Sequence, residues 1–228
     1  MKNSLLVILI LMLFSCDQAL SSSSMDTIDE EENETELGMN LSLRDNEVLE
    51  GQEYLDWYKE NMANFHGGKV LGEINVGASF IPSEIKYLQE KQQLDGEIKT
   101  NKGDSAVQAS YNEYEYYTVT ISMKDEKSDI LKSGASNLSF EALVEYLSFK
   151  IQKDFLIEAG GKEYACKQHV FERSFGLNPA ITLNLVFESI KNAGARKLVY
   201  KDELFGLGTV KFKVVSSKNI SSIPQLKE

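Results

Sequence analysis

The sequence predicts a mainly β fold: an antiparallel β-sandwich with short inserted helices and an N-terminal amphipathic helix. Apolar and polar residues alternate in about seven segments, as in strands with one buried and one solvated face, and such strands favour antiparallel sheets. No long helical segment separates successive strands, as a crossover between parallel strands would require. A single curved sheet packed on the helices is the alternative arrangement.

The segment before the strands, residues 47–64, is expected to form the amphipathic helix. Its apolar residues recur at the three-to-four spacing of a helix face: Leu49, Tyr54, Leu55, Trp57, Tyr58 and Met62. Gly67 and Gly68 are expected to end this helix. His66, just before them, is expected to stabilise the last helical carbonyls.

The strands are expected where the alternation is clearest. They cover residues 74–80, 116–123, 149–157, 163–172, 181–187, 197–200 and 210–214. A short helix is expected over residues 83–91 after Pro82, and a polar loop over residues 92–105. A second short helix, residues 140–147, should begin with Ser139 as its N-cap. Gly160 and Gly161 predict a tight hairpin turn.

The first sixteen residues have the pattern of a secretory signal. Lys2 precedes an apolar run from Leu5 to Phe14, and Ser15 and Cys16 follow. That run is shorter than the roughly 20 residues that a membrane-spanning helix needs. The ending Leu13-Phe14-Ser15-Cys16 resembles the lipobox of bacterial lipoproteins, in which the Cys is acylated and the peptide before it is removed. The resemblance implies a signal peptide over residues 1–15, lipidation at Cys16 and a membrane anchor in the cell envelope.

Residues 16–43 are expected to form a lipidated, disordered acidic tether. Residues 17–43 hold eight acids and no Lys or Arg, and a segment of low hydrophobicity and one sign of charge does not fold alone. An acidic stretch soon after the lipidated Cys resembles the surface-export signal of lipoproteins in Bacteroidota. It implies an outer-membrane protein that faces the cell exterior, with the periplasmic face as the alternative.

The globular domain, residues 44–228, is nearly balanced in charge. Removal of residues 1–15 takes away only Lys2, so the formal charge of −11 becomes −12, and residues 44–228 carry −4 of it. No basic patch is visible, so nucleic acid is not an expected partner. With Cys16 lipidated, Cys166 has no partner for a disulfide, and we expect it to be a buried small hydrophobe.

The sequence carries no catalytic or metal-binding motif in a recognised spacing. His66 and His169 are its only histidines, and neither belongs to a zinc or iron ligand pattern, so no metal and no cofactor are expected. A G-x-S-x-G elbow and a P-loop are missing from the sequence, which favours a non-enzymatic protein. A glycosidase pair of carboxylates would depend on the fold rather than on spacing.

Several residues are candidates for recognition or modification. Tyrosines crowd residues 111–117, and aromatic rings with polar tips suit recognition surfaces. The candidate binding surface is Trp57, Tyr114, Tyr116, His169 and Arg173. For Trp57, docking of the amphipathic helix on its own domain is the favoured alternative role. Asp26-Thr27-Ile28 and Asp104-Ser105-Ala106 resemble the three-residue O-glycosylation acceptor of Bacteroidota, which makes Thr27 and Ser105 candidate glycosylation sites.

Together these observations favour a non-enzymatic, membrane-anchored envelope lipoprotein. Its β-domain would bind a protein partner or support an envelope assembly. The alternative is a surface lipoprotein that binds or processes glycans. A groove lined by Trp57, Tyr114 or Tyr116 would favour the glycan alternative, and a flat patch without paired carboxylates would favour a protein partner.

Overall fold

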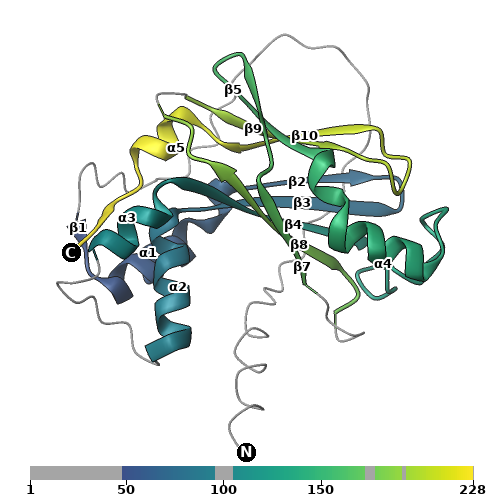
Figure 1. Cartoon of the computed structure of the whole chain (residues 1–228), viewed down its shortest axis with the longest axis horizontal. Helices are drawn as coiled ribbons and strands as arrows, with labels where there is room; N and C mark the ends of the chain where they lie inside the picture. Colours follow the sequence, from purple (N-terminus) through teal and green to yellow (C-terminus); the bar gives the residue numbers. More distant parts are fainter. Residues whose placement is uncertain (1–47, 96–104, 173–177, 192–193, 228) are drawn as a thin grey trace, which may run out of the picture. The chain divides into compact units, whose positions relative to one another are not determined.

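The computed structural model describes residues 48–95, 105–172, 178–191 and 194–227 (Figure 1). The chain divides into two compact units, Met1–Asn40 and Leu41–Glu228, and every described residue belongs to the second unit. The predicted signal peptide and tether, with Cys16 and Thr27, lie outside the described residues, and so does Arg173.

Two antiparallel sheets form most of the second unit and confirm the predicted mainly β, sandwich-like fold (Figure 1). The larger sheet contains, in spatial order, β2 (His66–Leu71), β3 (Ile74–Ile81), β4 (Tyr114–Met123), β8 (Ile181–Glu188) and β7 (Gln168–Glu172). The smaller contains β10 (Thr209–Val215), β9 (Arg196–Lys201), β5 (Phe155–Ala159) and β6 (Lys162–Ala165). A short parallel pair joins β1 (Val48–Leu49) to β11 (Gln225–Leu226).

The core lies between the inner faces of these sheets and follows from the alternation in sequence. In the larger sheet, Val119 of β4 is in register with Ala78 of β3 and Leu183 of β8, and each is 1% exposed or less. The next residue along each strand points to the opposite face. The alternation therefore gives this sheet one apolar face and one polar face.

Helices gather at two ends of the sandwich in Figure 1. One group comprises α1 (Gly51–Asn61), the 3-10 helix η2 (Met62–Phe65), α2 (Ser83–Asp95) and α3 (Ser105–Tyr111). The other comprises α4 (Phe140–Phe149) and the 3-10 helix η3 (Ile151–Asp154); α5 (Ser217–Ser221) precedes β11. Ser139 caps α4 as predicted, because its hydroxyl accepts a hydrogen bond from Ala142 N at 3.3 Å.

Two predicted strands differ from the structure. Residues 149–157 do not form one strand: α4 ends at Phe149, η3 follows, and β5 begins at Phe155. Ile151 and Phe155 are both buried, and their four-residue spacing fits a helical turn as well as a strand. Residues 163–172 break at Cys166, where the chain passes from one sheet to the other. Cys166 N donates to Phe155 O, and Lys167 N donates to Val186 O of the larger sheet.

Two predictions for non-strand segments also differ from the structure. The expected polar loop at residues 92–105 is helical at its two ends, because α2 continues to Asp95 and α3 begins at Ser105, and residues 96–104 lie outside the described residues. The expected helix end at His66 is the start of β2, which pairs with β3. Gly77 of β3 makes room for this pairing: a Cβ there would lie 2.9 Å from Thr120 Oγ1 and 3.1 Å from His66 Cε1.

Candidate functional site

The outer face of the larger sheet carries a row of polar side chains that bind one another. His66 Nδ1 lies 2.9 Å from Ser79 Oγ. Further along the same row, Thr118 donates to Asn184 Oδ1 at 2.9 Å, and Asn184 Nδ2 donates to Glu172 at 2.5 Å. Loss of hydration lowers the pKa of His66, which favours the neutral ring near pH 7. The row is a pre-ordered polar surface that can donate and accept hydrogen bonds.

Tyrosines meet at the end of this face that borders α2 and α3. Tyr111 of α3 packs edge-on against Tyr87 of α2 at 5.7 Å between ring centroids, and Tyr116 of β4 lies 6.3 Å from Tyr111. Tyr114 is two residues before Tyr116 on β4, so the two share a face of the sheet. We call Tyr87, Tyr111, Tyr114 and Tyr116 the tyrosine cluster. The structure thus places the two predicted tyrosines together and adds two others.

The tyrosine cluster combines one exposed ring, two half-buried rings and the buried ring of Tyr87 with hydrogen-bonding groups. Tyr114 is 39% exposed, and Tyr111 donates to Glu90 Oε2 at 2.5 Å. Lys86 Nζ lies 3.6 Å from the other oxygen of that carboxylate. Burial, and next the negative charge of Glu90, raises the pKa of Tyr116 to about 12, so its hydroxyl keeps its proton at neutral pH. Tyr111 could be anticipated from the tyrosine-rich segment, whereas Tyr87 reaches the cluster only because α2 packs beside α3.

Trp57 does not belong to an exposed binding surface, and the burial of its side chain confirms the alternative role, docking of the amphipathic helix on its own domain. Its side chain is 7% exposed and packs against Tyr54 and Phe65, with ring centroids 5.7 and 6.0 Å away. The amphipathic helix α1 buries this aromatic face against the sandwich. Trp57 is therefore a core residue that docks α1, and its ring is not available as a platform for a ligand.

His169 lies apart from the tyrosine cluster. On β7 it is in register with Leu185, which faces the core, whereas Tyr116 is in register with Val186 on the other face of the sheet. His169 Nε2 lies 2.9 Å from Leu147 O, and its Nδ1 lies 3.4 Å from Gln152 Oε1. The ring links β7 to the end of α4, which is a structural role. Ser105 is the first residue of α3, at the border of the described segment.

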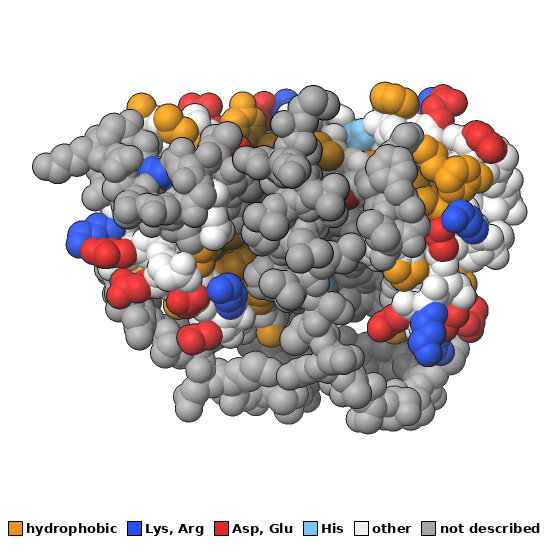
Figure 2. All heavy atoms as spheres, turned by 90° about the horizontal axis from the view of Figure 1, so that it is seen from below, with side chains coloured by type: hydrophobic (Ala, Val, Ile, Leu, Met, Phe, Trp, Pro, Cys, Tyr) orange, Lys and Arg blue, Asp and Glu red, His pale blue; other side chains and the backbone are white. Residues whose placement is uncertain are grey.

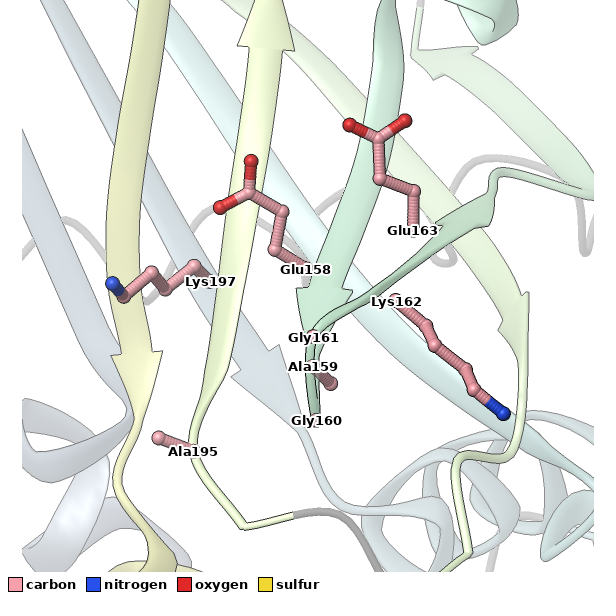
Figure 3. A pocket seen from close by; sticks show the side chains of 8 residues that line it. All are labelled: Glu158, Ala159, Gly160, Gly161, Lys162, Glu163, Ala195 and Lys197. Carbon is pink, nitrogen blue, oxygen red and sulfur yellow. The ribbon is translucent and has the colours of Figure 1, made fainter.

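A hollow of about 400 Å³ lies at the β5–β6 hairpin (Figure 3). Its lining is Glu158, Ala159, Gly160, Gly161, Lys162, Glu163, Ala195 and Lys197. Glu158 and Glu163 are directly opposite on neighbouring strands, and Figure 3 shows both carboxylates pointing the same way. Lys211 Nζ lies 2.7 Å from Glu158, so that carboxylate is a partnered surface charge. The hollow is lined by mixed charges and turn backbone, and no member of the tyrosine cluster contributes to it.

Cys166 is buried, as expected, with 6% of its surface exposed. Its thiol donates to Gln168 O at 3.1 Å, and burial raises its pKa to about 11. Within residues 48–95, 105–172, 178–191 and 194–227, no three His, Cys, Asp or Glu side chains gather in a way that could hold a metal ion. In the same residues, no helix is long and apolar enough to cross a membrane.

Comparisons with known proteins assign neither a family nor a function. No family model matches the chain, and no curated protein matches it. Among solved structures, the chain is similar to a DUF4426 family protein from Pseudomonas aeruginosa PAO1. The identity is 11%, the match covers 65% of this chain and 90% of that one, and the TM-score is 0.31.

Proposed function

We propose that this protein is a non-enzymatic lipoprotein of the bacterial cell envelope, anchored to the outer membrane by lipid on Cys16. Its β-domain binds a protein partner, or supports an envelope assembly, through the tyrosine cluster. The lipid anchor is supported by the N-terminal pattern of the chain: a cationic start and an apolar run that end in Leu13-Phe14-Ser15-Cys16. Two or more acyl chains hold a protein stably on a bilayer, and bacterial lipoproteins of this type carry two or three.

The tyrosine cluster supports a protein partner. Tyrosine is enriched at the centres of protein interfaces, because its ring buries a large apolar area and its hydroxyl still finds a hydrogen bond. Val107, four residues before Tyr111 on α3 and 51% exposed, extends the apolar part of this surface. Glu90 and Lys86 supply charges beside it. This pattern of aromatic centre and charged surroundings is typical of recognition surfaces.

The glycan alternative has weaker support. A groove lined by Trp57, Tyr114 and Tyr116 would favour it, but Trp57 is buried in the core. The hollow at the β5–β6 hairpin is lined by other residues. Tyr111 and Tyr116 are tilted by 39° to one another, whereas a flat sugar platform would favour coplanar rings. Only Tyr114 and Tyr116 remain as support for sugar binding, and the protein partner is the better supported proposal.

The anchor is tested by replacing Cys16 with Ala. The change should leave an uncleaved or soluble product, because the lipid acceptor is removed while the rest of the chain is unaltered. The measurement is radiolabelled palmitate incorporation followed by membrane fractionation. Equal labelling of the wild type and the variant would refute the lipid anchor.

The partner is tested by a photo-crosslinking amino acid at position 114 in intact cells, with the full lipoprotein as the bait. A discrete crosslinked band, identified by mass spectrometry, is expected. The matched control places the same amino acid at Lys213, an exposed position on β10. The same bands from both positions, or none from position 114, would refute the tyrosine cluster as the partner surface. A crosslink to glycan rather than protein would establish the alternative.

A further inference from the structure

Two adjoining segments, α4 and η3, meet the distant β9–β10 turn at the hydroxyl of Tyr146. Tyr146 of α4 places its hydroxyl oxygen 3.0 and 2.9 Å from the two carboxylate oxygens of Asp154, the last residue of η3. The same hydroxyl lies 2.8 Å from Glu203 Oε2, in the turn between β9 and β10. The two carboxyl groups are therefore joined through a single tyrosine.

The number of protons in this arrangement decides its stability. A phenol has one proton, so Tyr146 can donate to Asp154 or to Glu203 but not to both. With both carboxylates ionised, one of them would face a lone pair of the phenol oxygen without a proton between them. Every contact is satisfied when one carboxyl group carries a proton and donates it to the phenol, whose own proton then binds the other carboxylate.

Burial and charge place that extra proton on Asp154. Asp154 is 3% exposed, and a charge in such a place lacks hydration. Glu203 is 57% exposed, and Lys153 Nζ lies 2.9 Å from its Oε2, which stabilises the ionised form. Burial raises the pKa of Asp154 to about 6, whereas Lys153 and the Tyr146 hydroxyl lower the pKa of Glu203. Asp154 then donates to Tyr146, Tyr146 donates to Glu203, and Lys153 also donates to Glu203.

Of the other groups around Asp154, some raise its pKa and others lower it. From the β9–β10 turn, Glu203 and Asp202 raise its pKa through their negative charge. The Lys153 ammonium from η3 lowers it, and so does the Tyr146 hydroxyl from α4 when it donates its proton to Asp154. Burial is the largest effect and outweighs the two lowering effects, so Asp154 holds its proton more tightly than an ordinary aspartate, and the protonated form predominates below about pH 6.

We infer that Asp154, Tyr146 and Glu203 form a pH-responsive latch that holds α4 against the β9–β10 turn while Asp154 is protonated and loosens when Asp154 ionises. This inference does not depend on the proposed function. A pKa raised above its ordinary value means that the closed state binds the proton more tightly than the open state. The latch therefore contributes fully below the ordinary aspartate pKa, and its contribution is lost as the pH rises through about 6.

The latch controls a part of the molecule that carries exposed apolar side chains. On and just before α4, Leu138, Phe140 and Phe149 are 41%, 45% and 77% exposed. Figure 2 shows hydrophobic side chains beside charged ones at this end of the molecule. Leu143 and Leu147 of the same helix are buried in the core. Loosening of α4 would thus uncover further apolar surface at an end that already presents some.

The test is hydrogen exchange of the full mature lipoprotein in detergent micelles at pH 4.5 and pH 7.5, corrected for the intrinsic effect of pH. The protection of α4 amides should fall about tenfold or more from the lower to the higher pH. Asp154→Asn should stay protected at both, because the amide can donate to Tyr146 as a protonated carboxyl does. Glu145→Gln, at an exposed carboxylate on the same helix, should behave like the wild type.

Two results would overturn the latch. One is α4 protection that is the same at both pH values in the wild type; the other is a fall in Asp154→Asn equal to that of the wild type. If Asp154→Asn fails to fold, carboxyl-carbon NMR titration of the wild type decides. A midpoint for Asp154 near its ordinary value would refute the inference, and a midpoint near pH 6 would support it.

Discussion

Arg196 of β9 and Glu115 of β4 form an ion pair between the two sheets, with Nη2 2.9 Å from Oε1. Their side chains are only 7% and 8% exposed. Further hydrogen bonds satisfy the pair: Ile190 N and the Tyr117 hydroxyl donate to Glu115, and Arg196 Nη2 donates to Ile190 O. A buried and fully bonded pair fixes the relative position of the strands that carry it.

Breaking one half of this pair should destabilise the domain strongly. Glu115→Leu or Arg196→Met leaves an unpaired buried charge and should lower the free energy of unfolding by about 3–5 kcal/mol, as measured by urea denaturation. The double variant should recover much of that loss, since it removes both charges. The control is Glu145→Gln at the exposed pair with Lys150, which should leave the free energy of unfolding nearly unchanged. A similarly small cost for Arg196→Met would contradict the structural role of the pair.

Trp57, the chain's single tryptophan, should report on the docking of α1. Because its ring is buried against Tyr54 and Phe65, iodide should quench its fluorescence weakly in the folded protein and strongly after denaturation. Trp57→Ala should lower the free energy of unfolding by about 3–5 kcal/mol. Tyr114→Ala, at a partly exposed ring, is the comparison and should cost much less. Strong quenching in the folded state would show that the Trp57 ring is exposed to solvent and would contradict its burial.

Cys166 should react slowly with thiol reagents. Burial raises its pKa from 9.0 to about 11, so near pH 8 the thiolate fraction should be about 100-fold lower than in the unfolded chain. The fraction, and with it the rate, should rise as the pH increases toward 11. The measurement uses Cys16→Ser protein, so that one thiol is counted, with and without denaturant. Fast labelling of the folded protein at pH 8 would show an accessible, reactive thiol instead.

A chain of residues 44–228 should fold without metal or disulfide. Its stability comes from the apolar layer between the sheets, and Cys166 is a free cysteine. It should melt cooperatively, with a midpoint that neither chelator nor reductant changes. The measurement is calorimetry or circular dichroism. A large drop in the midpoint with either reagent would show that the fold depends on a metal or a disulfide.

The acidic tether should direct the protein to the cell exterior. Replacing residues 29–32 with Asn and Gln keeps the length and Cys16 but removes four of the eight negative charges in residues 17–43. Protease added to intact cells should then digest the wild type and spare the variant. Equal protection of the two proteins would place both on an inner face and leave the acids as a solvated spacer.

Local patterns were sufficient for much of the fold. The alternation over residues 181–187 predicted β8, because side chains that alternate in polarity alternate between core and solvent. Ser139 predicted the start of α4, because a cap depends on a neighbouring amide. The same reasoning placed Tyr114 and Tyr116 on one strand face. In contrast, the pattern over residues 163–172 could not show that the chain changes sheets at Cys166, since β6 and β7 alternate alike.

By itself, the sequence determined the strand faces, most helix positions and the expectation of a lipid anchor at Cys16, because each depends on residues close in the chain. Tertiary structure alone decided the Tyr87 contribution to the tyrosine cluster and the meeting of Asp154 with Glu203. It also decided the Glu115–Arg196 pair, whose members are 81 residues apart. Such pairs form only when the sheets stack and exclude water, and no local pattern encodes which charge will meet which.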